Sequence, residues 1–159
     1  MKNCVGSLDG ISVKIKKPSK SHGPKGYYCR KGFFSLNVQA MCDANRRFTF
    51  VSVKAAGSTH DSTAMAMSWL GKTITDGAFP RGLCDDAYKG GEQMLVLWPG
   101  KDLGCKKDSY NYWQSRMRIE IECAFGVLVR KWLLLGRGIE QRAAATKSAV
   151  LHPRMCAPA

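Results

Sequence analysis

Acidic side chains stand at three places in this chain where they could act on a phosphodiester. Asp9 lies in GSLDG, Asp85 and Asp86 lie in LCDDAY, and the segment RMRIEIECAFG carries Glu120 and Glu122. Three carboxylates presented together can hold two divalent ions, one activating an attacking water or hydroxyl and the other stabilising the leaving oxygen. Hard ions such as Mg²⁺ or Mn²⁺ suit oxygen ligands and substrate phosphates. These residues therefore raise the hypothesis of a metal-dependent nuclease.

Each carboxylate also has a purely structural interpretation. Arg116 and Arg118 stand four residues before Glu120 and Glu122, so both glutamates can form exposed ion pairs within one helix, each worth a few tenths of a kcal/mol. Asp9 with the glycine after it is a common turn pair, and the aspartate pair of LCDDAY can cap the turn that follows. Spacing alone leaves both interpretations open.

The tripeptide His60-Asp61-Ser62 contains the residue types of a nucleophilic triad. Three consecutive residues cannot fold back on one another into the required relay, so we exclude that interpretation. Asp61 or Ser62 is expected to cap the helix that follows. The second interpretation of Asp61 is an acidic neighbour of the metal pocket.

Positive charge dominates the chain as a whole. Twenty-five Lys and Arg against twelve Asp and Glu give a formal net charge of +13, the balance expected of a protein that binds a polyanion. The segment KKPSKSHGPKG (16–26) has loop composition, and the two tyrosines after it could stack on bases; a solvated loop is the alternative. The residues assigned to nucleic-acid binding are Lys14, Lys16, Lys17, Lys25, Arg30, Lys31, Arg116, Arg118 and Lys131.

The composition also argues against several other classes of protein. With 45% hydrophobic and 23% charged residues, one globular core is expected, and no window approaches the roughly 18 unbroken apolar residues of a membrane span. The seven cysteines are odd in number, scattered, and without a C-x-x-C pair. They are expected to be free thiols in a reducing compartment rather than a disulfide framework or a zinc site. No secretory signal is apparent.

The strands that would position the carboxylates are indicated by period-two patterns. Alternation predicts a strand over 5–15, and β-rich runs over 36–42 and 48–53 predict an antiparallel hairpin beside it. Leu83–Cys84 is expected to end a buried strand that delivers the aspartate pair to its carboxyl edge. Most of 89–111 is expected to be loop.

The helices are indicated by a change of period. A helix of about three turns is expected after Gly57, and a long helix over 113–135 is expected to carry the two glutamates. Its buried stripe would place Glu122 beside the core and Glu120 on the opposite flank, as a partner for Arg116. The order of elements predicts an α/β fold. The stripe consists of Ile121, Phe125, Leu128, Trp132 and Leu135.

Four segments, taken in order, resemble the conserved blocks of Harbinger-type DDE transposases and the nucleases derived from them. The resemblance runs from about Val5 to Leu135, and its most specific block is N-x-x-x-S-x-x-R-x-x-x-E-x-x-F-G, which begins at Asn111. The segments are GSLDG; YYCRKGFFSLNVQAMCD with RFTFVSVKAAGSTHDST; LCDDAYKGGEQMLVLWPG; and YNYWQSRMRIEIECAFGVLVRKW.

The resemblance implies particular site residues. The first aspartate of the family falls on Asp9, the aspartate of its D-x-x-Y block on Asp85, and its glutamate on Glu122, with Asp86 as the rival to Asp85. Asp61 matches the H-D-S block as a further acidic candidate. A ribonuclease H-like mixed sheet with an antiparallel hairpin and flanking helices is implied. Strand cleavage and joining of DNA with Mg²⁺ or Mn²⁺, a nuclear location and a Myb-like DNA-binding partner are implied as well.

The resemblance also divides the chain. Residues 1–135 are expected to form the DDE endonuclease domain, and 136–159 a truncated or divergent tail in which AVLHP matches an eroded family helix. The family's upstream DNA-binding-type region is expected to be missing. The first hypothesis is therefore an endonuclease or transposase catalytic domain able to form a homo-oligomer. The second is a domesticated or decayed module that binds nucleic acid without cutting it.

Overall fold

The computed structural model describes residues 4–20, 23–77, 81–84, 87–88 and 92–139, and the account below concerns these residues. They form five strands, a short 3₁₀ helix and four α-helices. The strands are β1 (Cys4–Lys14), β2 (Ser35–Cys42), β3 (Phe48–Ala56), β4 (Arg81–Leu83) and β5 (Met94–Leu95). The helices are η2 (Pro24–Tyr27), α1 (Asp61–Ala66), α2 (Trp69–Thr75), α3 (Cys105–Lys131) and α4 (Leu133–Arg137).

The strands form one mixed sheet in the order β3-β2-β1-β4-β5. β1 pairs with β2, and β2 with β3, in antiparallel fashion, which confirms the predicted first strand and hairpin. β4 pairs with β1 in parallel, and β5 with β4. The α/β class is thereby confirmed. The two-residue β5 was not predicted, because a strand that short has no measurable period.

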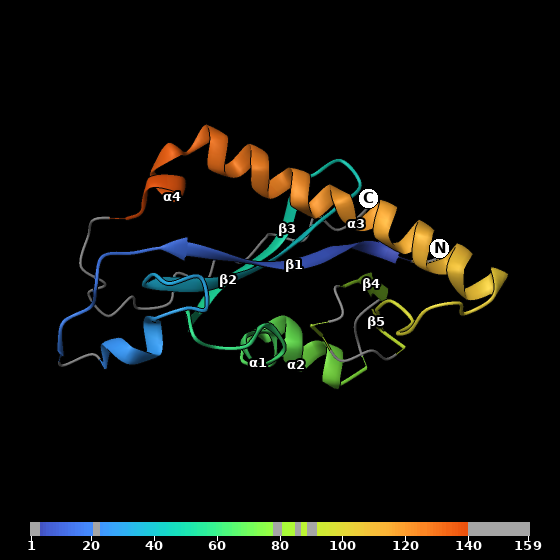
Figure 1. The fold of residues 1–159 in the computed structure, drawn as a ribbon, viewed down its shortest axis with the longest axis horizontal. Helices are drawn as coiled ribbons and strands as arrows, with labels where there is room; N and C mark the ends of the chain where they lie inside the picture. Colours follow the sequence, from blue (N-terminus) through green and yellow to red (C-terminus); the bar gives the residue numbers. More distant parts are fainter. Residues whose placement is uncertain (1–3, 21–22, 78–80, 85–86, 89–91, 140–159) are drawn as a thin grey trace, which may run out of the picture.

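Helices cover both faces of this sheet (Figure 1). α3 lies over one face, where Ile121, Ala124 and Phe125 pack against Ala40 and Cys42. α1 and α2 lie over the other face. There Leu8 of β1 and Met41 of β2 form a second cluster with residues of both helices, because successive side chains of a strand point to opposite faces. The sheet therefore carries a hydrophobic cluster on each of its faces.

The single helix expected after Gly57 is in fact two short helices. Ser68 interrupts it: its hydroxyl donates to the Met65 carbonyl and accepts the Gly71 N–H at 3.0 Å, which caps α2. Gly71 lies directly against the Met65 carbonyl, and a Cβ there would collide with it. The spacing of the apolar residues predicted one helix, because this spacing does not reveal a capping residue in the middle of the segment.

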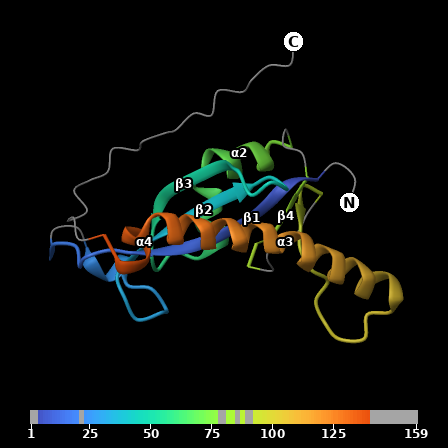
Figure 2. The ribbon, with the colours of Figure 1, turned by 90° about the horizontal axis from the view of Figure 1, so that it is seen from above.

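α3 is longer at its start than predicted. It begins at Cys105 rather than near 113, so part of the expected loop is helical. Figure 2 shows these first turns projecting beyond the sheet. The residues concerned are mostly polar and exposed, and a helical segment that buries nothing leaves no hydrophobic period in the sequence. The helix ends at Lys131 rather than near 135, and α4 follows after Trp132. Trp132, predicted to belong to the buried stripe, is 58% exposed, because it lies at the C-cap and no longer follows the helical period.

α4 continues the fold past residue 135. Ile139, just after it, forms a parallel bridge with Ile15 next to the end of β1. Residues 140–159 lie outside the described part of the chain. None of the described helices is both long enough and apolar enough to span a membrane.

The described cysteines are free thiols in contrasting environments. Cys42 is fully buried, and burial together with the negative charge of Asp43 and Glu120 raises its pKa to about 11, whereas Cys105 is exposed. At pH 8 we expect an alkylating reagent to modify Cys105 at least about 100-fold faster than Cys42, since only the thiolate reacts. Mass spectrometry of labelled peptides measures this. Equal rates in the folded protein would contradict the buried position of Cys42.

Candidate active site

Two of the predicted acidic residues meet at one arginine. Nη1 of Arg118 lies 3.5 Å from Oδ2 of Asp9 and 2.9 Å from Oε1 of Glu122. Asp9 and Arg118 are largely buried, with side chains 22% and 18% exposed, whereas the Glu122 side chain is 51% exposed. The fold thus brings together Asp9 and Arg118, which are 109 positions apart in the sequence. One carboxylate is fixed in the protein body and the other faces solvent.

The position of α3 over β1 explains this geometry. The hydroxyl of Ser7 donates to the Met117 carbonyl at 3.1 Å, which joins strand and helix next to the pair. Ile121 is fully buried against the sheet and fixes the rotation of the helix. Residues 118 and 122 lie one turn apart on one face of α3, so both side chains stand above the middle of β1. The predicted helix register is confirmed.

The backbone also contributes to the position of Asp9. Its Oδ1 accepts the N–H of Gly10 at 2.7 Å. Asp9 itself pairs with Ala40 in the β1–β2 ladder, so it is a mid-strand residue and not part of a turn. The turn interpretation of this Asp-Gly pair is therefore wrong.

Glu120 has a different partner from the one predicted. It accepts from Nε of Arg46 at 2.7 Å, and this hydrogen bond, together with the glutamate charge, raises the pKa of Arg46. Arg46 sits in the β2–β3 turn with φ 61°, a turn closed by the Asp43 carboxylate, which accepts from the N–H groups of residues 45 and 47. Arg116 instead donates to the Tyr112 hydroxyl at 3.1 Å. The predicted Arg116–Glu120 pair is wrong, because Arg46 of the β2–β3 turn binds Glu120 instead. The spacing of residues along a helix cannot show a partner that comes from another element.

Asp85 and Asp86 lie outside the described residues. Their neighbour in the chain, Cys84, is described: its carbonyl accepts from Nε2 of Gln114 at 2.6 Å. β4 ends beside β1, with Leu83 paired to Ser7, two residues before Asp9. The strand expected to lead into the aspartate pair is therefore present and lies next to β1.

Asp61 lies on the other face of the sheet from the Asp9–Glu122 pair. Its Oδ1 accepts from Asn37 at 2.8 Å and from Gln39 at 3.0 Å, and a Cβ added to Gly10 would lie 2.6 Å from the same oxygen. Because Asp9 and Gly10 are consecutive in a strand, this contact is on the face that Asp9 does not occupy. Asp61 is also not the cap: the N-cap of α1 is His60.

The network around Asp61 was not predicted. The Gln39 side chain is 1% exposed, donates to Oδ1 of Asn37 at 2.6 Å, and accepts from the hydroxyl of buried Tyr88. Buried amides are costly unless paired, so Asp61 serves here as the acceptor that satisfies them. The polar residues at alternating positions of β2 were the only sequence signal for it.

The two aspartates are therefore expected to respond differently to substitution. We expect Mn²⁺ or Mg²⁺ to raise the melting temperature, and Asp9→Asn to abolish most of that rise, since it removes a charge from the pair shared with Glu122. Asp61→Asn keeps the Oδ1 acceptor and lies across the sheet, so it should retain that rise. Differential scanning fluorimetry with and without metal measures both. Loss of the metal response in Asp61→Asn alone would contradict this placement.

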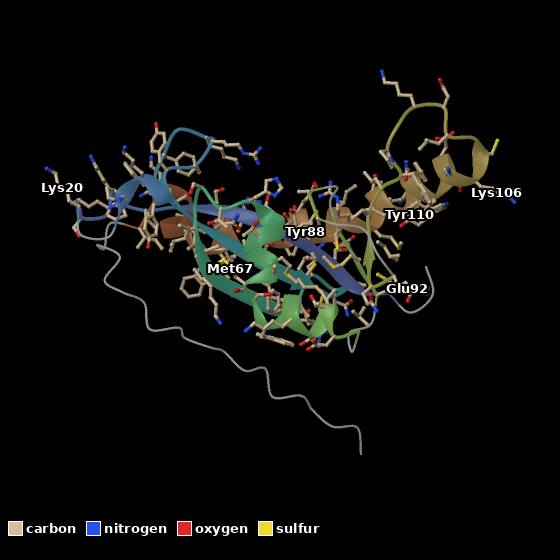
Figure 3. The ribbon with its side chains drawn as sticks, turned by 90° about the horizontal axis from the view of Figure 1, so that it is seen from below. Lys20, Met67, Tyr88, Glu92, Lys106 and Tyr110 are labelled. Carbon is tan, nitrogen blue, oxygen red and sulfur yellow. The ribbon has the colours of Figure 1, made fainter. Side chains whose placement is uncertain are left out.

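The predicted nucleic-acid contacts fall into two groups. Most are exposed, and the chain between β1 and β2 lies at one end of the molecule, where Figure 3 labels Lys20. Arg118 differs, because its charge is engaged by two carboxylates and its Nε is buried without a hydrogen-bond partner among the described residues. The exposed members are Lys14, Lys16, Lys17, Lys25, Arg30, Lys31, Arg116 and Lys131.

The donor chemistry of the pair fits divalent cations. Oδ2 of Asp9 and Oε1 of Glu122 both lie near Nη1 of Arg118, so these two oxygens are less than about 8 Å apart. Two metal ions about 4 Å apart, each bound to an oxygen at about 2 Å, would span roughly that distance. Carboxylate oxygens are the ligands that Mg²⁺ and Mn²⁺ prefer. Within the described residues no cluster of three or more metal-ligating side chains occurs, so the pair alone is an incomplete site.

Comparison with known proteins extends over almost the whole chain. A family model described as DDE superfamily endonuclease matches residues 8–156. No curated protein and no solved structure matches the chain. The matched span includes Asp9, Arg118 and Glu122 and all of α3 and α4.

Proposed function

The chain belongs to the DDE superfamily endonucleases, and we propose that it is a divalent-metal-dependent DNA endonuclease of Harbinger type with a ribonuclease H-like fold. The observation that carries this proposal is the convergence of Asp9 and Glu122 on Arg118. Asp85 is the proposed third carboxylate, with Asp86 as its rival, because both follow Cys84 in the chain and β4 runs beside β1. The proposed reaction is phosphodiester cleavage and strand transfer by a two-metal mechanism.

The proposed roles follow from burial and charge. DDE superfamily endonucleases generally use divalent metals, and Mg²⁺ or Mn²⁺ bound here would activate the attacking oxygen and stabilise the leaving one. Asp9 is held in a strand by its backbone pairing, so its carboxylate is preorganised. Glu122 is half-exposed on a helix and can adjust as substrate enters. Arg118 holds the two carboxylates in one place.

DNA is the proposed substrate because the chain is strongly basic, with a formal net charge of +13. The exposed lysines and arginines between β1 and β2, together with Lys131 on α3, would attract and hold the phosphate backbone. Metal ions would offset the negative charge of the carboxylate pair itself. Binding should therefore weaken steeply as salt rises.

The second function, binding without cleavage, is supported by Arg118. Its guanidinium already offsets one of the two negative charges of Asp9 and Glu122, so the fold can hold the pair without a metal. A decayed or domesticated module could keep this arrangement as an ion-pair network. The enzyme hypothesis is preferred because Asp9 and Glu122 remain acidic and adjacent.

A plasmid-nicking assay tests the proposal. Supercoiled DNA is incubated with the protein and Mg²⁺ or Mn²⁺ over a range of concentrations, with EDTA as the control, while binding is followed by gel shift. Conversion to open circles that requires metal supports the endonuclease. DNA binding that survives EDTA, with no nicking at any metal concentration, would establish the binding module instead.

Location and partners form a further part of the proposal and rest on the resemblance to Harbinger-type transposases. We place the protein in the nucleus, working as a homo-oligomer with a Myb-like protein that reads the DNA sequence. Microscopy of a tagged chain and co-purification with candidate Myb-like proteins test this. An exclusively cytoplasmic signal would overturn the location.

A further inference from the structure

A second surface on α3 carries aromatic and cationic side chains that the proposed cleavage chemistry does not use. It is a groove of about 880 Å³ between the segment after β5 and the first half of α3. Figure 3 shows this part of α3, labelled at Lys106 and Tyr110, extending from the body of the molecule. Its main lining residues are Trp98, Asn111, Tyr112, Ser115, Arg116 and Ile119.

The aromatic rings of the groove are exposed yet held in place. Trp98 is 49% exposed and Tyr112 58% exposed. The side-chain amide of Asn111 accepts the backbone N–H of Trp98 at 2.9 Å and donates to its carbonyl at 3.0 Å, which fixes the Trp98 backbone against α3. The Trp98 ring in turn contacts the Lys107 ammonium, and the Tyr112 hydroxyl accepts from Arg116. Exposed aromatic rings gathered at one place mark a binding surface. Rings that are already ordered lose little entropy when a ligand stacks on them.

Each of these rings has a cation beside it. Nζ of Lys107 lies 4.5 Å from the centre of the Trp98 ring, and Nη1 of Arg116 donates to the Tyr112 hydroxyl at 3.1 Å. The acidic residue that lines the groove, Glu120, is already paired with Arg46. The surface therefore combines flat apolar faces with positive charge, which complements a ligand that has flat bases and phosphates.

The groove lies next to the carboxylate pair on the same helix. Arg116 and Ile119 flank Arg118 in the chain, and Tyr112 is ten residues from Glu122, about 15 Å along the helix axis. That length corresponds to roughly four stacked nucleotides at 3.4 Å each. A strand leaving the carboxylates could therefore continue into the groove.

We infer that this groove binds an unpaired DNA strand next to the cleavage position, with bases stacked on Trp98 and Tyr112 and phosphates near Lys107 and Arg116. The inference rests on the proposed function for its substrate. A duplex keeps its bases stacked inside, so the rings cannot reach them, whereas a single strand exposes them. The groove thus selects DNA that is already unpaired.

The experiment compares a single-stranded oligonucleotide with a blunt duplex, in EDTA, by fluorescence anisotropy. Replacing Trp98 and Tyr112 together with alanine should weaken single-strand binding by at least about tenfold and change duplex binding less than about twofold. Trp132→Ala is the matched control, because Trp132 is equally exposed at the far end of α3 and does not line the groove. Quenching of tryptophan fluorescence by the oligonucleotide should decrease in the double variant and persist in the control.

Three results would overturn the inference. The first is a double variant that binds single strands as wild type does, and the second is an equal loss of single-strand and duplex binding. The third is a change from an oligomer to a monomer with unchanged single-strand affinity, which would make the groove a contact between copies. Melting temperatures of all variants verify folding, and Trp98→Phe with Tyr112→Phe should restore binding. Because no metal is present, loss of nicking in a separate assay would count against the proposed function and not against the groove.

Discussion

Glu122→Gln is expected to lower the rate of metal-dependent plasmid nicking by about a thousandfold or more. Glutamine keeps the size of the side chain but removes the negative charge that would hold a cation beside Asp9. Transition-state stabilisation by a bound metal is worth several kcal/mol, and each 1.36 kcal/mol corresponds to a factor of ten in rate. The helix should persist, since Glu122 is half-exposed and its ion pair contributes little to stability.

Glu120→Gln is the matched control for this prediction. It makes the same chemical change two residues earlier on the same helix, but its partner is Arg46 in the β2–β3 turn. Nicking should fall less than about threefold, because a surface ion pair of this kind contributes little. Gel-shift titration with duplex DNA, which the groove on α3 is not expected to bind, should show nearly unchanged, salt-sensitive binding for both variants. A large loss in Glu120→Gln with little loss in Glu122→Gln would mean that the assignment of the catalytic glutamate is wrong.

The sheet was predictable where burial follows a regular period. β1, β2 and β3 alternate apolar and polar residues, or fill one face with small and apolar ones, so their bounds fall within a few residues of the prediction. β5 has two residues, and its pairing depends on β4 beside it rather than on its own sequence. Short edge strands are specified by tertiary contacts that no local pattern contains.

The helices, like the strands, were predicted where their residues are buried at regular spacing and missed elsewhere. Ile121 and Phe125 fixed the register of α3, and that register places Glu122 correctly toward β1. The first two turns of α3 bury almost nothing, and the cap at Ser68 depends on a single hydroxyl, so neither produced a signal. Hydrophobic periods predict the parts of a helix that are packed and miss the parts that are solvated.

The site was predicted in part for a related reason. Sequence order and resemblance indicated Asp9 and Glu122, and the fold brings both to Arg118. Arg118 itself was interpreted as a phosphate contact or as a simple helical partner, since spacing shows Glu122 four residues away but not Asp9 across the interface. A place for Asp61 near the metal pocket stayed open as a second interpretation, after helix capping, because the sequence alone did not show on which face of the sheet its side chain lies.

The structure gives Arg118 a definite role in the protein without metal. Its guanidinium balances two carboxylates that would otherwise repel each other beside a buried strand. A cation entering between Asp9 and Glu122 would be repelled by the same guanidinium. We therefore expect Arg118 to stabilise the fold without metal and, in the proposed metal-dependent function, to oppose the binding of a cation. A single substitution can separate these two effects from a simple loss of packing.

Arg118→Met is expected to lower the free energy of unfolding by about 1 to 3 kcal/mol without metal, because a largely buried Asp9 loses its charge partner while a long apolar side chain preserves the packing. Adding Mn²⁺ should restore more stability than it adds to wild type, since metal becomes the counter-charge of the pair. Urea denaturation with and without Mn²⁺ measures both. Arg116→Met is the control, because Arg116 contacts Tyr112 and neither carboxylate. A smaller metal response in Arg118→Met than in wild type would show instead that the arginine organises the ligands for the ion.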